Sequence, residues 1–194
     1  MGEGGEGSRG GGAVSFPVLE TNRLVLRQIT TADANELFAI FSDQEVMKFY
    51  DCEALVNIDE AISLIRRFSD WFENKSGYRW GITLKAGPET IIGTCGLFAL
   101  RNPARIATLG YELSPQHWRL GIMSEAICAV LAHGFNNLNI NKIRATATTD
   151  NIASAKLLES LSFRKEGIFR QAQFLNGKFD DLAAYALLRE EWTP

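Results

Sequence analysis

The sequence has few of the features that mark secreted, membrane or nucleic-acid-binding proteins. Its three cysteines, Cys52, Cys95 and Cys128, are widely spaced and form no C-x-x-C pair. This composition disfavours a disulfide framework or a zinc site and is typical of a reducing compartment. No apolar run approaches the roughly 18 residues of a membrane span. A formal net charge of −3 argues against a generic polyanion binder. We therefore expect a cytoplasmic protein with no metal, membrane or nucleic-acid partner.

A glycine-rich segment opens the chain. Residues 1–12 hold seven glycines and no large apolar side chain apart from Met1. Such a segment buries little surface and loses much backbone entropy on ordering, so we predict a disordered leader over residues 1–15. The chain of 194 residues has the length of one domain whose core needs no disulfide or metal. We predict that residues 16–194 form this single domain.

Hydrophobic periodicity predicts an α/β fold. Alternating or apolar segments predict strands over residues 23–28, 79–85, 90–100, 106–114, 142–149, 163–174 and 181–188, with a turn A-G-P-E over residues 86–89. Three-four spacing predicts helices over about 31–42, 58–74, 121–138 and 151–161. A meander of strands followed by alternating strands and helices is typical of a mixed sheet with helices on both faces.

Two strand-to-helix junctions carry residues suited to ligand binding. In the first, a strand ends at Ser114 and the strongest helix follows Gly121, where unpaired N–H groups and the helix dipole favour an anion; Arg119 adds positive charge. In the second, Asn151 is placed to cap a helix that carries Ser154 in its first turn. Taken singly, each junction is better explained as an ordinary helix start without a ligand.

Taken together, these segments resemble the general N-acetyltransferase (GNAT) superfamily. The resemblance runs through L-E-T-N-R-L-V-L-R, I-I-G-T-C-G-L, G-Y-E-L-S-P, W-R-L-G-I-M-S-E-A, N-I-A-S-A-K-L-L-E-S-L-S-F and E-G-I-F-R-Q-A-Q-F-L-N-G-K-F-D-D, and covers nearly all of residues 18–192. Within the superfamily the sequence is most similar to the ribosomal-protein N-terminal acetyltransferases, which modify an α-amino group with acetyl-coenzyme A (acetyl-CoA). The resemblance implies a central mixed sheet splayed in the middle, acetyl-CoA as cosubstrate, and a monomer or homodimer.

The resemblance also implies roles for single residues of the cofactor site. The family's pyrophosphate loop, (Q/R)-x-x-G-x-(G/A), falls on residues 118–123, where Gly121 is kept and Trp118 and Met123 depart from the pattern. Asn151 is expected beside the pantetheine arm, and Ser154 near the thioester sulfur. Backbone N–H groups are expected to hold the pyrophosphate at Arg119, Leu120, Gly121, Ile122, Met123 and Ser124. The splayed strand edge is expected to pair with the pantetheine amides at Glu112, Leu113 and Ser114.

Two departures from the family pattern shape the expected chemistry. Some relatives have a Glu at the position of Gln173, and many superfamily members have a Tyr general acid at the position of Leu158. Neither Gln nor Leu can exchange a proton. Glu112 is therefore the candidate base, acting through a water, with an exposed strand position or a dimer contact as its alternative interpretation. Ser154 is the remaining candidate to protonate or hydrogen-bond the leaving thiolate.

The acceptor is expected to be an amine, bound in a pocket that the family shapes at positions matching Tyr50, Asp51 and Gln173. An α-amino group has a pKa of about 7.7–8.0 against about 10.4 for a lysine side chain, so more of it is neutral near pH 7. This favours a protein or peptide N-terminus. No activated Cys or Ser–His pair is evident, so we expect direct transfer in a ternary complex.

Three alternatives stay open. One is an acetyltransferase for a small amine, such as a polyamine or an aminoglycoside, which would use an acidic cleft. A second is a coenzyme-A-binding module without catalysis, suggested by Leu158 and Gln173. A third is a purely structural α/β domain. The acidic cleft of the first alternative would be formed by Glu45, Asp51, Glu53, Asp59, Glu60, Asp180 and Asp181.

Overall fold

An eight-stranded sheet forms the centre of the computed structural model, which describes residues 15–50, 52–100, 103–175 and 177–193. Its strands lie in the order β1-β2-β3-β4-β5-β6-β8-β7. They are β1 (Leu19–Glu20), β2 (Leu24–Gln28), β3 (Gly77–Leu84), β4 (Gly87–Phe98), β5 (Ile106–Leu113), β6 (Lys142–Thr148), β7 (Arg164–Leu175) and β8 (Lys178–Leu188). Residues 1–14 of the predicted leader lie outside the described residues, so that prediction and the domain boundary stay predictions.

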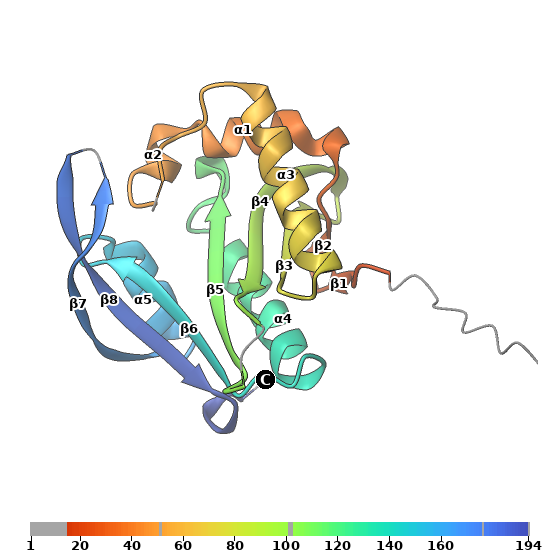
Figure 1. The fold of residues 1–194 in the computed structure, drawn as a ribbon. Helices are drawn as coiled ribbons and strands as arrows, with labels where there is room; N and C mark the ends of the chain where they lie inside the picture. Colours follow the sequence, from red (N-terminus) through yellow and green to blue (C-terminus); the bar gives the residue numbers. More distant parts are fainter. Residues whose placement is uncertain (1–14, 51, 101–102, 176, 194) are drawn as a thin grey trace, which may run out of the picture.

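Helices cover both faces of the sheet (Figure 1), which confirms the predicted fold class. One face carries α1 (Ala34–Phe41) and α3 (Ile58–Glu73), and the other carries α4 (Ile122–Asn136) and α5 (Ile152–Ser160). The short helix α2 (Gln44–Met47) follows α1. Three 3-10 turns complete the elements, at Thr31–Asp33, Pro115–His117 and Arg189–Glu191. Within the described residues, no helix has both the length and the apolar character needed to cross a membrane.

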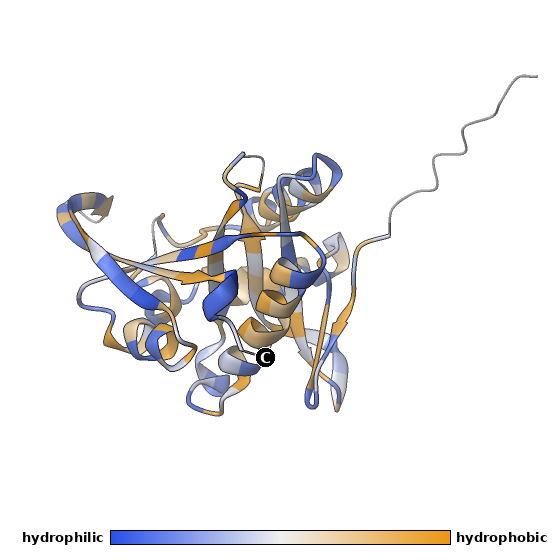
Figure 2. Ribbon diagram, turned by 90° about the horizontal axis from the view of Figure 1, so that it is seen from below, coloured by the Kyte–Doolittle hydropathy of each residue, from blue (hydrophilic) through white to orange (hydrophobic). Residues whose placement is uncertain are grey.

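The core has two parts, one on each face of the sheet. The larger part packs α4 and α5 against the strands and includes the fully buried Trp80, Ile127 and Leu158. The smaller part packs α1 and α3 over the sheet and includes Phe41 and Ile65. Each such side chain contributes about 1.5–3 kcal/mol by leaving water. Figure 2 shows hydrophobic residues running through the strands and through the helices that cover them.

The sheet splits between its two parallel strands, β5 and β6. They pair only over Ile106–Thr108 and Lys142–Arg144, although β5 continues to Leu113 and β6 to Thr148. Beyond this short contact each strand is held by its other neighbour, because β4 pairs with the rest of β5 and β8 pairs with all of β6. Figure 1 shows β5 and β6 meeting at their first residues and then diverging. The splayed sheet expected from the sequence is therefore present.

Two local features differ from the sequence expectation. The turn between β3 and β4 is at residues 85–86 rather than 86–89, because Leu84 already pairs with Gly87. Strand β7 contains a bulge between Phe169 and Gln173, where Gln171 takes a positive φ of 49° and its N–H donates to Asp181 Oδ1 at 2.8 Å. The bulge turns the end of the β7–β8 hairpin toward the first helices, as Figure 1 shows.

Candidate active site

The loop between β5 and α4 has the geometry of an anion-binding helix start. Gly121 is the N-cap residue of α4 with a φ of 72°, and Arg119 also takes a positive φ of 61°. No side chain in the described part of the chain caps this helix, so the N–H groups of its first turn, which have no partner within an α-helix, stay available to a ligand. Ile122 and Met123 anchor the turn because their side chains are buried, whereas Ser124 is half-buried. Leu120 and Arg119 are exposed.

Arg23, directly before strand β2, supports this loop, a role that the sequence did not predict. Its Nη1 donates to the Leu120 carbonyl at 2.9 Å, and its Nε donates to Glu125 Oε2 at 2.6 Å. Thr21 donates to the other carboxylate oxygen at 2.5 Å. Partial burial would raise the pKa of Glu125, but the hydrogen bonds from Thr21 and Arg23 hold it below its usual value. The loop before Gly121 is thus fixed, with a guanidinium beside it.

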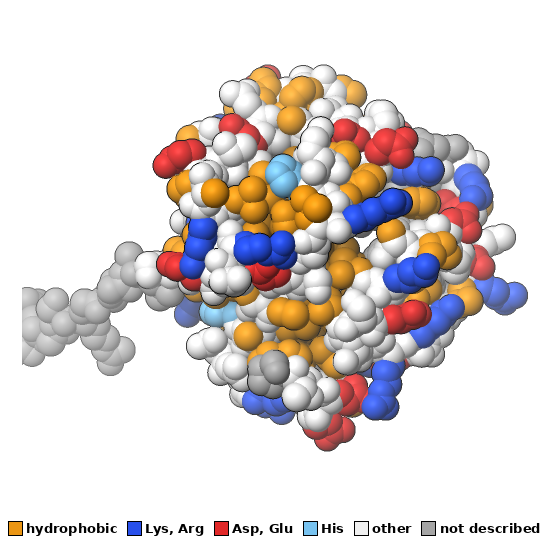
Figure 3. Space-filling view, turned by 180° about the vertical axis from the view of Figure 1, so that it is seen from behind, with side chains coloured by type: hydrophobic (Ala, Val, Ile, Leu, Met, Phe, Trp, Pro, Cys, Tyr) orange, Lys and Arg blue, Asp and Glu red, His pale blue; other side chains and the backbone are white. Residues whose placement is uncertain are grey.

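Around this loop, apolar side chains lie exposed between basic ones. Trp118, Leu120 and Ile152 are 42%, 56% and 57% exposed, and they belong to the loop before α4 and the first turn of α5. Figure 3 shows hydrophobic side chains gathered on the middle of this face, with Lys and Arg on both sides. Such a surface fits a long ligand that has an apolar arm and phosphate groups.

The edge of β5 that faces β6 is partly engaged by the protein itself. Ser114 donates its N–H to the Ile92 carbonyl at 2.9 Å and accepts from His117 N–H at 3.0 Å, so its two backbone groups serve the fold. Leu113 is buried, and its carbonyl accepts from Trp118 Nε1 at 2.7 Å. Because hydrogen-bond direction alternates along a strand, the backbone groups of Leu113 and Tyr111 point away from β4. The Leu113 N–H and the backbone groups of Tyr111 are therefore the ones directed toward the opening, and the pairing predicted at Ser114 stays a prediction.

The start of α5 brings two hydroxyl groups together. Asn151 caps the helix, and its Oδ1 accepts from Ser154 N–H at 3.0 Å. Ser154 Oγ then lies 2.6 Å from the hydroxyl of Tyr111, which comes from β5. Burial raises the pKa of Tyr111 to about 12, although the hydrogen bond to Ser154 opposes the shift. Tyr111 was not predicted as a site residue. The position of the expected Tyr, Leu158, is fully buried in the core.

Glu112 lies on the opposite face of β5, toward α1 and α3. Its Oε2 accepts hydrogen bonds from Arg79 and Thr94, and all three side chains are buried. Burial alone would lower the pKa of Arg79, but the charge and hydrogen bond of Glu112, together with contributions from Tyr50 and Cys95, hold it above its usual value. Glu112 Oε1 is also buried and has no hydrogen-bond partner among the described residues. An acceptor oxygen is therefore left on this side of the strand.

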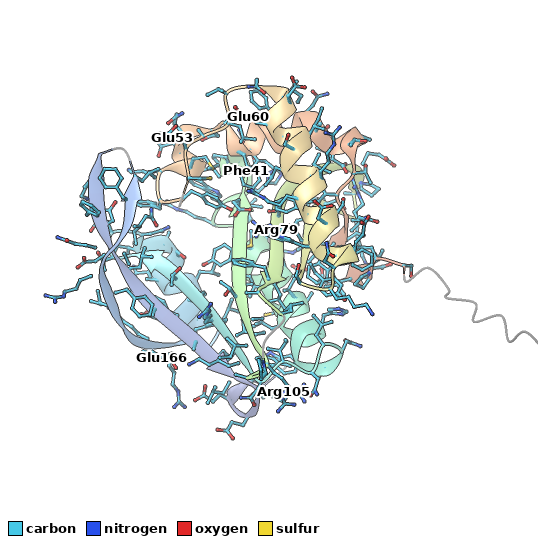
Figure 4. The ribbon with its side chains drawn as sticks, viewed as in Figure 1. Phe41, Glu53, Glu60, Arg79, Arg105 and Glu166 are labelled. Atoms are coloured by element: carbon cyan, nitrogen blue, oxygen red, sulfur yellow. The ribbon has the colours of Figure 1, made fainter. Side chains whose placement is uncertain are left out.

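The side chain of Arg79 extends from β3 across β4 to Glu112 on β5. Glycines on β4 and β5 leave room for it. A Cβ on Gly96 would come within 2.8 Å of Arg79 Cδ, and a Cβ on Gly110 within 2.7 Å of Arg79 Nη1. The guanidinium also lies 5.5 Å from the ring centre of Phe68 on α3. Figure 4 shows Arg79 between the sheet and α3. The register of β3, β4 and β5 thus builds the ion pair, which no local sequence pattern reveals.

The hairpin and the segment after α2 meet on the Glu112 side. Gln173 Nε2 donates to the Tyr50 carbonyl at 2.7 Å, and the Tyr50 ring lies edge-on to Phe41. Two of the three expected acceptor residues are thus in contact, and the third, Asp51, lies outside the described residues. Among the described residues, no group of three or more His, Cys, Asp or Glu side chains is placed to hold a metal ion.

The arrangement combines features that acyl transfer to an amine requires. One strand, β5, presents a carboxylate on one face and a hydroxyl pair on the other, at the point where the sheet opens. An anion-binding helix start adjoins the same strand. These features fit a long phosphorylated thioester on one side of β5 and a nucleophile on the other.

Comparisons with known proteins agree with this geometry. The sequence profile of the Acetyltransferase (GNAT) domain matches residues 23–164. An uncharacterized N-acetyltransferase, YoaA of Bacillus subtilis, is 44% identical over 174 residues, which are 90% of this chain and 98% of YoaA.

Solved acetyltransferase structures share the fold. The ribosomal-protein-S5-alanine acetyltransferase of Vibrio fischeri superposes with a TM-score of 0.80 at 21% identity, covering 92% of this chain and 100% of that one. The spermidine N-acetyltransferase of Vibrio cholerae, solved with CoA and spermine, superposes with a TM-score of 0.78 at 21% identity, covering 88% and 98%. The chain belongs to the GNAT acetyltransferase family and is an acetyl-CoA-dependent N-acetyltransferase.

Proposed function

We propose that this protein acetylates the α-amino group of a protein or peptide N-terminus, by direct transfer within a ternary complex with acetyl-CoA. The observation that carries the proposal is the placement of Glu112 and Tyr111 on opposite faces of β5 where β5 leaves β6. Donor and acceptor then approach the strand from different sides. Cys95 and Cys128 are free thiols, which supports a cytoplasmic setting.

The donor side of the proposal draws on the helix start and the β5 edge. The N–H groups of residues 119–124 hold the pyrophosphate. The outward backbone groups of Tyr111 and the N–H of Leu113 pair with the pantetheine arm beside Asn151. Ser154 lies at the sulfur end. Acetyl-CoA supplies the activated acetyl group, and the protein's own groups bind and orient it.

On the acceptor side we assign the base to Glu112. Its Oε2 is held by Arg79 and Thr94, so the carboxylate is fixed in one orientation. Its Oε1 is the atom that receives the proton of the amine, through a water. An α-amino group needs little help, because with a pKa of about 7.7–8.0 a substantial fraction is neutral at pH 7.4. A lysine or polyamine nitrogen needs much more help from a base, because its pKa is higher and almost all of it is protonated at this pH.

The charge of the acceptor side also favours an N-terminus over a polyamine. Arg79 compensates the charge of Glu112, and Gln173, on the same side, is a neutral amide. Several residues of the conceivable acidic cleft serve the local structure instead. Glu60 accepts from Val56 N–H at 2.8 Å, Asp180 pairs with Lys178 at 2.7 Å, and Asp181 accepts from Gln171 N–H. A polycation would find little net negative charge to bind.

The experiment is a matched acceptor screen that measures release of the coenzyme A thiol. One arm uses peptides with a free N-terminal Ser or Ala and no lysine, and a second uses the same peptides with a blocked N-terminus and one internal lysine. A third uses spermidine and an aminoglycoside. We expect turnover with the first arm, with the acetyl group located on the N-terminal nitrogen by mass spectrometry. Turnover with spermidine or the aminoglycoside alone would contradict the proposal.

A further inference from the structure

We propose that Tyr111 is a positioning residue for the leaving thiolate: its hydroxyl orients the hydroxyl of Ser154 so that the Ser154 O–H faces the coenzyme A sulfur. The inference rests on the proposed placement of that sulfur beside Ser154. Stabilisation of the leaving thiolate by a tyrosine, which the family pattern would place at Leu158 on helix α5, is thereby assigned to Tyr111 on strand β5.

The two hydroxyls come from opposite sides of the opening in the sheet. Tyr111 is on β5, Ser154 is on α5, and they are 43 positions apart in the chain. Both residues are fixed by contacts on the side away from the opening. The Tyr111 ring packs against the larger core cluster, and the backbone of Ser154 is fixed by the hydrogen bond to Asn151. The 2.6 Å contact therefore joins two rigid supports where β5 and β6 have separated.

Either oxygen could donate across this contact, and our proposal assigns the donor. Among the described residues, the hydroxyl of Tyr111 has Ser154 Oγ as its hydrogen-bond partner. Burial raises its pKa to about 12, so it keeps its proton through the neutral range. In our proposal Tyr111 donates this proton to Ser154 Oγ. Ser154 then has its own proton free for a second acceptor. A hydroxyl that accepts a hydrogen bond is also a stronger donor.

This pair replaces the tyrosine that helix α5 lacks. Leu158 is fully buried and has no proton to give. Acetyl transfer breaks the C–S bond, forms the C–N bond and moves one proton from the amine to the departing thiolate overall. In our proposal Tyr111 and Ser154 keep their protons and stabilise the thiolate by hydrogen bonding, while the transferred proton comes from the amine through Glu112 and water.

The test compares Tyr111→Phe, Ser154→Ala, the double variant and a control, Tyr78→Phe. Tyr78 packs in an aromatic cluster with Phe16, Phe72, Trp80 and His133, so the control removes a hydroxyl elsewhere. The first readout needs no acceptor. Thiolate absorbance, with desulfo-coenzyme A as the blank, gives the pKa of the bound coenzyme A thiol. We expect Tyr111→Phe to raise this pKa by about half a unit to one unit.

The second readout is steady-state turnover. We expect Tyr111→Phe to lower kcat by about fivefold to tenfold with little change in KM for acetyl-CoA. The double variant should be no worse than Ser154→Ala, and Tyr78→Phe should match the wild type.

The outcomes separate this inference from the proposed function. If Ser154→Ala changes neither the thiol pKa nor kcat, the sulfur is not beside Ser154 and the placement in the proposed function fails. If Ser154→Ala changes both but Tyr111→Phe changes neither, the proposed function stands and the role of Tyr111 is overturned. Additive effects in the double variant would likewise overturn it, because Tyr111 would then act independently of Ser154.

Discussion

Gly110 lies directly against the guanidinium of Arg79, so that a Cβ on Gly110 would come within 2.7 Å of Arg79 Nη1. The side chain of Arg79 has no room to retreat, because it is buried and held by Glu112 and Thr94. The absence of a side chain at Gly110 on β5 therefore makes space for the buried guanidinium of Arg79 on β3.

The first prediction concerns this contact. Gly110→Ala should lower the free energy of unfolding by about 1–3 kcal/mol, because it overpacks a site whose neighbour cannot move cheaply. The matched control is Gly87→Ala on β4, where a Cβ would meet nothing within 4 Å. Its effect should stay within about 0.5 kcal/mol. Urea unfolding measures both, and equal values for the two variants would refute the constraint.

The second prediction concerns the base. Glu112→Gln keeps the shape of the side chain but cannot take a proton. At pH values below the pKa of the acceptor amine, we expect kcat/KM on an N-terminal peptide to be about 100-fold lower than in the wild type. At pH values above that pKa, the difference in kcat/KM between variant and wild type should become smaller. The rates should be measured across pH 6–9 well below the unfolding temperature of the variant. A constant ratio at every pH would remove Glu112 as the base.

The third prediction separates charge from backbone strain at the loop. Gly121 has a φ of 72°, so any side chain there costs about 1 kcal/mol of stability. Gly121→Ala should lose this stability yet still bind coenzyme A, since its Cβ would lie 3.5 Å from Arg23 Nη2, an ordinary contact. Gly121→Glu should weaken binding by about 100-fold or more through charge repulsion. Calorimetry with equal affinities for the two variants would contradict the loop assignment.

The fourth prediction is a pH dependence of stability at Glu125. Its pKa is lower in the folded protein, so its stabilisation is complete above the unfolded pKa of about 4.3 and is lost as pH falls through the lower folded pKa. Arg23 is 46% exposed, so we expect less than about 1 kcal/mol between the wild type and Glu125→Gln at neutral pH. That difference should shrink below about pH 4. A difference that persists at pH 3 would show a contribution from packing alone.

Much of the fold follows from local patterns that a single sequence displays. Helix α4 and strands β2, β5 and β6 were predicted within two residues of their observed bounds, because apolar spacing and the glycine before α4 fix them. Strand β1 and helix α2, with two and four residues, are too short to produce a periodic signal. The turn after β3 was displaced because cross-strand pairing, and not the Gly-Pro pair, decides where β4 begins.

The site was harder to predict because its contacts span distant parts of the chain. Glu112 was predicted as the base because Gln173 departs from the family pattern, but its burial and its partner Arg79 depend on the register of three strands. Tyr111 stands beside Glu112 in the sequence, yet its contact with Ser154 exists only because α5 returns to the end of β5. A tyrosine beside a predicted base on a half-buried strand was the one signal available.

A crystal structure of the complex with coenzyme A tests the central claim most directly, through the position of the sulfur relative to β5. We predict the sulfur on the α5 side, within hydrogen-bonding distance of Ser154 Oγ, with the pyrophosphate against the amide groups of residues 119–124 and Glu112 across the strand. A sulfur bound away from β5, or on the face that carries Glu112 and Arg79, would contradict the account.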